Sequence, residues 1–178
     1  MRLEKDKLCI RDAAAVDAKQ LALWWNDGSV MAHAGFPYGL GISEEEIRES
    51  LAKDDDEIRR RLIIEYDGKK IGEMNFSKKE DAGSIGIKIC EKEYQERGLG
   101  RVCLSLLIKE LFNRGYQKIV LDTNLNNTRA QHVYELLGFE KKRVNIDSWR
   151  DQTGKLNSSV DYELTEEDFH DYAKGEDL

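Results

Sequence analysis

Apolar residues recur at helical spacing in the middle of the chain. Leu104, Leu107, Ile108, Leu111 and Phe112 occupy positions i, i+3, i+4, i+7 and i+8. Because a helix turns once every about 3.6 residues, this spacing places their side chains on one face. We therefore predict a long amphipathic helix here, with this face buried.

Strands are indicated by short apolar runs and by alternation. Ile85, Ile87 and Ile89 alternate with other residues, which directs them to one face of a strand. Asp67 and Gly68 separate two apolar runs and are typical of a tight hairpin turn. The predicted strands cover residues 7–11, 62–66, 70–76, 83–90, 118–123, 142–148 and 158–164.

Capping residues and breakers mark the helix boundaries. Ser43 and Glu46 form the pattern of a capping box, and Asn127 is placed to cap a shorter helix that ends at Gly138. The predicted helices cover residues 12–25, 43–53, about 100–114 and 127–138, and a short acidic helix starts at Thr165. Residues 28–42 are predicted to form a loop, and the acidic run 54–57 a solvated helix end and loop.

The order of these elements predicts an α+β, mixed α/β fold. A central mixed sheet of about seven strands is flanked on both faces by about four helices, with the short C-terminal helix in addition. The connection from strand 83–90 through the long helix to strand 118–123 should be parallel and right-handed. At 178 residues the chain is predicted to form a single domain, 1–178.

Composition limits the classes of function. Hydrophobic residues make up 40% of the chain and charged residues 35%, which is ordinary for a soluble globular protein. The formal net charge of -7 argues against a nucleic-acid partner, which would need a basic face, and is compatible with a cationic small substrate or a basic peptide. No apolar run is long enough to span a membrane, and the start of the chain has no secretory pattern.

The cysteines and histidines do not suggest a metal site. Cys9, Cys90 and Cys103 each lie in an apolar stretch, so we predict buried free thiols, and no zinc-ligand spacing is present. These features predict a reducing, cytoplasmic setting. The sequence leaves open whether the protein is a monomer or a homodimer.

A turn with two glycines opens directly into the long helix. Gly98 and Gly100 allow a tight turn with uncovered amide groups, and the helix N-terminus adds its own free N–H groups and positive dipole end. Together they predict a phosphate site. The spacing fits neither a P-loop nor the dinucleotide fingerprint.

The turn and the segments around it resemble the GNAT superfamily of acetyl-CoA-dependent N-acetyltransferases. The residues that carry the resemblance are Gln95, Gly98, Gly100, Asn127, Ala130, Tyr134, Gly138 and Phe139. A finer resemblance, to the RimJ/RimL-like branch, is carried by Trp24-Trp25-Asn26-Asp27, Val30-Met31, Gly154 and Val160-Asp161-Tyr162. The resemblance covers nearly the whole chain.

The resemblance implies how acetyl-CoA would bind. Its pyrophosphate would lie on amides near residues 97–101, and two parallel strands would splay apart so that the pantetheine arm pairs with freed backbone groups. The predicted donor-binding residues are Gln95, Arg97, Gly98, Leu99, Gly100, Arg101, Ile87, Ile89 and Asn127. Arg97 and Arg101 could equally be solvent-facing charges, and Asn127 could serve as an N-cap as well.

The resemblance also implies the catalytic groups. Tyr134 would protonate the leaving thiolate; the competing interpretation is a packed aromatic ring. Several family members carry a glutamate where this chain has Ser84, so Glu73 is the best remaining base, acting directly or through water. A plain edge carboxylate is the other interpretation of Glu73. His132 is predicted to be structural.

The predicted function is transfer of an acetyl group from acetyl-CoA to a primary amine by direct attack. The acceptor would be a small-molecule amine or a protein N-terminus, bound between loop 28–42, the second helix and residues 148–158, with Phe36, Tyr38 and Trp149 shaping the site. Two alternatives stay open: a catalytically weak CoA-binding sensor or interaction module, and a nucleotide-binding domain.

Overall fold

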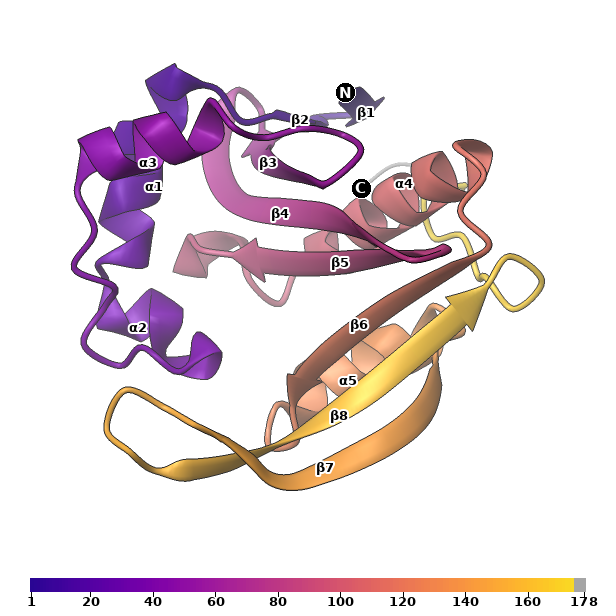
Figure 1. Cartoon of the computed structure of the whole chain (residues 1–178). Coiled ribbons are helices and arrows are strands. Elements are labelled where there is room, and N and C mark those ends of the chain that lie inside the picture. The colour runs from indigo at the N-terminus through magenta and orange to yellow at the C-terminus, as the bar shows by residue number, and fades with distance from the viewer. Residues whose placement is uncertain (175–178) are drawn as a thin grey trace.

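The computed structural model describes residues 1–174 and contains one eight-stranded mixed sheet. The strand order is β1-β2-β3-β4-β5-β6-β8-β7, and β5 and β6 form the parallel pair (Figure 1). The strands are β1 Arg2–Lys5, β2 Leu8–Asp12, β3 Arg59–Tyr66, β4 Lys69–Lys79, β5 Ala82–Ile89, β6 Lys118–Asn124, β7 Glu140–Arg150 and β8 Leu156–Thr165.

Helices cover both faces of this sheet. The α-helices are α1 Ala18–Trp25, α2 Gly28–Met31, α3 Glu44–Leu51, α4 Leu99–Asn113 and α5 Thr128–Leu136, and the short 3-10 segments are Ala15–Asp17, Ala32–Ala34 and Lys92–Tyr94. The mixed sheet, the parallel crossover through α4 and the helices on both faces confirm the predicted fold class.

Side-chain alternation along β3 separates two hydrophobic cores. Leu62 and Ile64 join the cluster that α4 and α5 cover, whereas Ile63 points the other way and joins the cluster of α1 and α3. The predicted apolar face of α4 is buried in the larger cluster. Successive residues on a central strand therefore point to opposite faces of the sheet, one covered by α4 and α5 and the other by α1 and α3.

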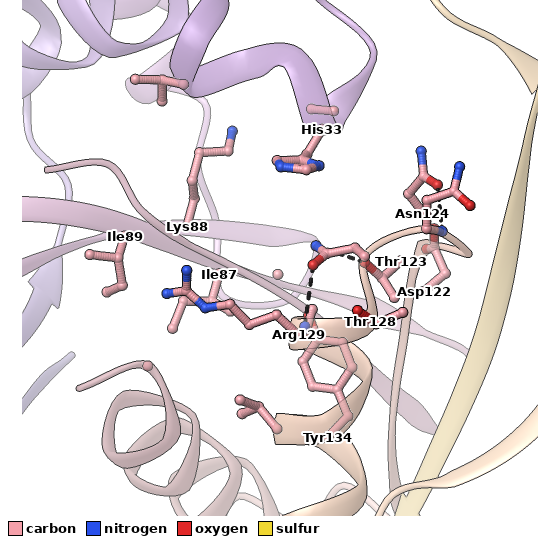
Figure 2. Close-up of a pocket in the computed structure, with 18 of the residues that line it drawn as sticks. His33, Ile87, Lys88, Ile89, Asp122, Thr123, Asn124, Thr128, Arg129 and Tyr134 are labelled. Atoms are coloured by element: carbon pink, nitrogen blue, oxygen red, sulfur yellow. Dashed lines mark hydrogen bonds between the residues drawn. The ribbon is translucent and has the colours of Figure 1, made fainter. Parts of the chain in front are cut away.

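β5 and β6 separate after only a short stretch of pairing. Their register runs from Ala82↔Lys118 to Ser84↔Val120, although both strands continue well beyond this point. β5 remains bonded to β4, and β6 remains bonded to β8, so the sheet opens between them toward the side where α2 lies (Figure 1). The predicted splay is confirmed, and Figure 2 shows the side chains that surround the opening.

Local turn and cap patterns formed as predicted. Ser43 and Glu46 make the capping box at the start of α3. The Asn127 side chain accepts a hydrogen bond from the amide of Ala130 and caps α5. Gly138 has φ of 97°, and a Cβ there would lie 1.9 Å from the carbonyl oxygen of Asp168. Only glycine satisfies both constraints at this helix end.

Several predictions near the N-terminus were wrong. Asp12 does not cap the first helix, because its carboxylate instead accepts from the amino group of Met1 at 2.6 Å. The strand β1 was not predicted, since Leu3 is its single apolar residue and no alternation of polar and apolar residues is visible. Residues 28–34, predicted as a loop, form α2 and a 3-10 turn, with the Asp27 side chain capping at Ser29.

The predicted C-terminal helix from Thr165 is also absent over the described residues. β8 extends through Thr165, and turns follow as far as residue 174. The chain runs along α4 instead: the ring of Phe169 lies 6.0 Å from that of Phe112, and the Tyr172 amide donates to the Ser105 hydroxyl at 3.0 Å. These tertiary contacts replace the hydrogen bonds of a helix.

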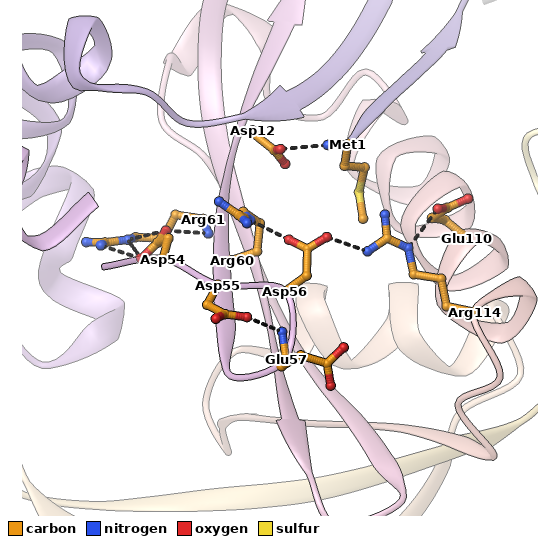
Figure 3. A network of polar contacts seen from close by, with 10 residues as sticks. All are labelled: Met1, Asp12, Asp54, Asp55, Asp56, Glu57, Arg60, Arg61, Glu110 and Arg114. Carbon is orange, nitrogen blue, oxygen red and sulfur yellow. Dashed lines mark hydrogen bonds and ion pairs between the residues drawn. The ribbon is translucent and has the colours of Figure 1, made fainter. Parts of the chain in front are cut away.

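The acidic run 54–57 forms a loop as predicted, but only Asp55 and Glu57 are exposed to solvent. The Asp54 carboxylate receives paired hydrogen bonds from Arg61, and both side chains are buried. Asp56 lies between Arg60 and Arg114, which joins the loop before β3 to the end of α4 (Figure 3). A cluster of acidic residues in sequence therefore becomes a set of cross-links, because the arginines that neutralise it come from elsewhere in the chain.

Two further features concern the described chain as a whole. Cys9, Cys90 and Cys103 are free thiols in buried positions, as predicted. None of the helices within residues 1–174 is both long and apolar enough to cross a membrane.

Candidate functional site

A large open cavity occupies the gap between β5 and β6. Its volume is about 1040 Å³, which exceeds that of most small-molecule pockets. The walls come from β5, β6, the start of α4, α5, the segment 29–34 and the β7–β8 hairpin. Segments that are far apart in sequence therefore converge on one elongated site.

The glycine turn stands at one end of this cavity. Gly98 has φ of 77° and is the N-cap of α4, so the chain enters the helix from a left-handed conformation that favours glycine. Within residues 1–174, the amides of Gly98, Leu99 and Gly100 donate to no other group. These free N–H groups and the positive end of a 15-residue helix form an anion site.

Gly100 keeps the entrance to this anion site open. It lies in the first turn of α4 and lines the cavity, and an added Cβ would meet only Ile87 Cδ1, at 4.0 Å. A side chain at position 100 would project into the space beside β5. Absence of a side chain thus lets a ligand approach the helix backbone closely.

The structure brings together five of the predicted donor-binding residues at the cavity wall. These are Gln95, Gly100, Ile87, Ile89 and Asn127. The Gln95 amide donates to the carbonyl oxygen of Ile89 at 2.9 Å, which ties the glycine turn to the free edge of β5. Asn127 lines the cavity while also capping α5, so its two predicted roles are compatible.

The other four predicted donor residues do not line the cavity. Gly98 and Leu99 supply backbone at the turn, and the Leu99 side chain is buried. The Arg97 guanidinium lies over the rings of Tyr66 and Tyr94, and that of Arg101 lies over Tyr172. The buried Nε of Arg101 has no hydrogen-bond partner among the described residues.

Tyr134 points its phenol from α5 toward the cavity (Figure 2). Its ring is 8% exposed and packs edge-on against Phe139 and Tyr162. Burial, with a smaller contribution from the charge of Asp122, raises the pKa of Tyr134 to about 12. The phenol therefore stays protonated at neutral pH. Both predicted aspects, a packed ring and a placed acid, coexist in this side chain.

Asp122 on β6 is a cavity residue that sequence reasoning missed. Water reaches it through the open cavity, but the surrounding walls partly bury it and, with a smaller effect of Asp161, raise its pKa above the ordinary value. Asp122 and Tyr134 line the same cavity, and the charge of Asp122 contributes to the raised pKa of the Tyr134 phenol. The sequence signal that could have identified Asp122 is its position five residues before Asn127.

Glu73 on β4 lies beside the cavity and not in its wall. Its carboxylate accepts a hydrogen bond from the Trp25 indole at 2.8 Å and pairs with Lys88, whose Nζ lies 3.6 Å away. Lys88 is opposite Glu73 in the β4–β5 register and does line the cavity. Among the described residues, the ion pair with Lys88 links Glu73 to the cavity wall.

The predicted acceptor-binding aromatics divide in the structure. Trp149 lines the cavity and its ring packs against Gly35, where an added Cβ would lie 2.6 Å from Cζ3. Phe36 is half-buried and Tyr38 is exposed, and neither lines the cavity. Gln152 bonds to the backbone of 35–39 at three points, which holds this loop against the β7–β8 turn.

The Cys90 thiol and the absence of a metal-binding group among the described residues bear on the chemistry of the cavity. Cys90 lines it, but burial raises the pKa of this thiol, so it stays protonated and is a weak nucleophile. Residues 1–174 hold no group of three or more His, Cys, Asp or Glu side chains placed to bind a metal ion.

Sequence comparison identifies the family. A sequence model of the acetyltransferase (GNAT) family matches residues 31–139, which run from the last residue of α2 to just beyond α5 and include the glycine turn. The chain therefore belongs to the acetyltransferase (GNAT) family. It is also similar to a ribosomal protein bS18-alanine N-acetyltransferase of Escherichia coli (strain K12), with 34% identity over 70 residues. That match covers 39% of this chain and 47% of the relative, so the chain spans about half the length of this relative.

Solved structures share the fold. The RimL ribosomal L7/L12 α-N-protein acetyltransferase in complex with coenzyme A superposes with a TM-score of 0.81, at 17% identity, covering 93% of this chain and 98% of that one. A spermidine N-acetyltransferase from Vibrio cholerae, in complex with CoA and spermine, gives a TM-score of 0.81 at 21% identity, covering 92% and 98%. The RimJ/RimL-like resemblance thus extends to the fold.

Proposed function

We propose that this chain transfers an acetyl group from acetyl-CoA to a primary amine by direct attack. The observation that carries the proposal is the open seam between β5 and β6, with free helix-terminal amides at one end and with Tyr134 and Asp122 in its wall. Family membership and the CoA complexes of the fold relatives support the same donor.

The residues present fit a CoA donor. Its pyrophosphate would bind the amides of residues 98–100, and Gly100 leaves room for that approach. The unpaired edge of β5 beside Ile87 and Ile89 offers backbone groups to an extended amide-containing arm. Arg97 and Arg101 are proposed to interact with phosphate from the flanks of the turn, after leaving their aromatic partners.

Acetyl-CoA supplies the acetyl group as a thioester and departs as the CoA thiol. The acceptor nitrogen forms the new C–N bond as the C–S bond breaks, so one proton leaves the nitrogen and one joins the sulfur. Tyr134, held protonated by its raised pKa, donates the proton to sulfur. Cys90 takes no part as a nucleophile, since direct attack needs no acyl-enzyme.

Asp122 is proposed to accept the proton from the acceptor amine. It is the single carboxylate among the described residues of the cavity wall, and its raised pKa moves it closer to the operating pH, where a base is more effective. Glu73 stays a second candidate, acting through Lys88 or water, because its carboxylate is already held by Trp25 and Lys88. Comparing Asp122→Asn with Glu73→Gln separates the two assignments.

The donor assignment is tested by thermal unfolding. Acetyl-CoA at about 100 times its dissociation constant should stabilise the fold by about 2.7 kcal/mol, which raises the melting temperature by about 5–10 °C for a chain of this length. NAD and ATP at equal concentration should give no comparable shift. A larger shift with either nucleotide would favour a nucleotide-binding domain.

Release of CoA thiol with a panel of primary amines tests the enzymatic step. We expect turnover with at least one amine, and loss of that turnover in Tyr134→Phe. Tight acetyl-CoA binding without thiol release for any amine would instead indicate a CoA-binding sensor. The acceptor proposed here is a small-molecule amine or a protein N-terminus, as the names of the relatives suggest.

A further inference from the structure

The charges of the cavity wall differ in sign from the charge of the chain. The whole sequence carries -7, yet the described residues of the wall include the three cations Lys88, Lys92 and Arg129 against the single carboxylate of Asp122. A ligand responds to the charges that it touches more than to distant ones, which salt screens. The local balance is therefore the relevant one for choosing an acceptor.

Two of these cations belong to the donor end. Arg129 Nη1 pairs with Glu96 Oε1 at 3.2 Å, and Glu96 lies in the glycine turn before α4. Lys92 lies in the short segment that leads into Gln95. Both are accounted for by a phosphate-bearing donor. Lys88 remains as a cation without a role in donor binding.

Lys88 lies on the opposite face of β5 from the donor side chains. Ile87 and Ile89 pack toward the α4 cluster, so the intervening Lys88 projects toward α1 and α2. Its Nζ lies 2.9 Å from Met31 Sδ and 3.6 Å from Glu73. An ammonium group has three hydrogens, so one donor remains for a ligand in the cavity.

His33 adds a second polar group on the same side. It follows α2 in the 3-10 turn Ala32–Ala34 and, like Lys88, lines the cavity. Figure 2 shows Lys88 and His33 near each other above the opening, Asp122 at its right beside Thr123, and Tyr134 below it. The arrangement offers hydrogen-bond donors on one wall and a proton acceptor on the other.

We infer that the acceptor is a primary amine that carries a carboxylate close to the amine, as an α-amino acid or an acidic N-terminal peptide does. The carboxylate would bind Lys88 and His33 while the amine faces Asp122 and Tyr134. A polyamine is disfavoured, because its second ammonium group would meet that of Lys88, and the adjacent Glu73 carboxylate is already paired with Lys88 and hydrogen-bonded by Trp25. This inference rests on the proposed function, whose acceptor class it narrows.

Matched acceptor pairs test the inference on the unaltered protein. The pairs are free amino acids against their amides, and peptide amides with Asp against Asn as second residue, all compared per deprotonated amine, with spermidine as the polyamine. A hydrogen bond to a charged group corresponds to a preference of at least about tenfold. We therefore expect the carboxylate-bearing amine of each pair to have a KM at least about tenfold lower than that of its neutral partner. The two sets of pairs distinguish a free amino acid from a peptide as its source.

Variants locate the preference at Lys88. Lys88→Gln should bring the acid-to-amide ratio of kcat/KM close to one, Lys88→Arg should keep it, and Lys155→Gln, on the exposed β7–β8 turn outside the cavity, should leave it unchanged. A kcat/KM for the amides or for spermidine that equals or exceeds that for the acids would overturn the inference and leave the proposed function intact. If no amine is turned over, the proposed function itself is wrong.

Discussion

Replacing Tyr134 by phenylalanine removes one oxygen atom from the centre of the cavity. The phenol makes no hydrogen bond with another described residue, and the ring contacts with Phe139 and Tyr162, at centroid distances of 5.9 and 5.7 Å, remain available to phenylalanine. The free energy of unfolding should therefore change by less than about 0.5 kcal/mol. Any large loss of activity would then report chemistry and not folding.

The size of that loss follows from the acidity of the phenol. General acid catalysis contributes about 10²- to 10⁴-fold, and it is most effective when the pKa of the acid is near the operating pH. Because burial raises the pKa of Tyr134 to about 12, the effect should lie near the lower limit. We expect kcat to fall about 10²-fold, or about 2.7 kcal/mol in the barrier, with the affinity for acetyl-CoA nearly unchanged.

Tyr162 provides a matched control. It is also a buried tyrosine whose pKa is raised to about 12, first by burial, but its hydroxyl donates to Glu135 on α5 at 3.1 Å. Tyr162→Phe should lower the free energy of unfolding by about 1–2 kcal/mol and leave kcat close to wild type. The assay is initial-rate thiol release together with urea unfolding. Equal kcat in wild type and Tyr134→Phe would refute the general-acid assignment.

Three further outcomes are expected. The rate should fall as the pH decreases through the raised pKa of Asp122, since a protonated carboxyl accepts no proton. Asp122→Asn should remove this acidic limb of the pH–rate profile. An unchanged limb in the variant would exclude Asp122 as the base. Asp17 is buried, and hydrogen bonds from Arg11 and Lys70 outweigh the effect of burial and lower its pKa. Its contribution to the free energy of unfolding is therefore present above the ordinary pKa near 3.9 and is lost as the pH falls below that value. Asp17→Asn should cost about 3 kcal/mol in urea unfolding at pH 7, and a cost below about 1 kcal/mol would contradict this reasoning. Gly100→Asp should weaken acetyl-CoA binding at least about tenfold in calorimetric titration, because a side chain and a negative charge enter the anion site, and unaltered affinity would place the pyrophosphate elsewhere.

Elements with short-range patterns could be predicted from sequence. The turn at Asp67-Gly68, the capping box at Ser43 and the cap at Asn127 each involve residues within a few positions of one another, and all formed as predicted. The apolar face of α4 and the parallel crossover were accessible for the same reason. A local rule is reliable where the tertiary structure does not compete with it.

The features that sequence reasoning missed depend on distant partners. The ion pair of Asp56 with Arg114, at the end of α4, turned part of an acidic run into a cross-link, and contacts with α4 replaced the predicted C-terminal helix. Lys88 and Asp122 became cavity residues because β5 and β6 separate, which no periodicity in either strand reveals. The donor end of the site could therefore be predicted from its motif, whereas the acceptor end required the fold.

Direct transfer to an amine is tested most directly by following a labelled acetyl group. The protein is incubated with trideuteroacetyl-CoA and the panel of primary amines, which includes amino acids, their amides and spermidine, and the products are analysed by mass spectrometry alongside the thiol released. We expect the label on the acceptor nitrogen in a one-to-one ratio with CoA thiol, and its loss in Tyr134→Phe. Thiol release without labelled amine, or acetyl-CoA binding without either product, would contradict the proposed function.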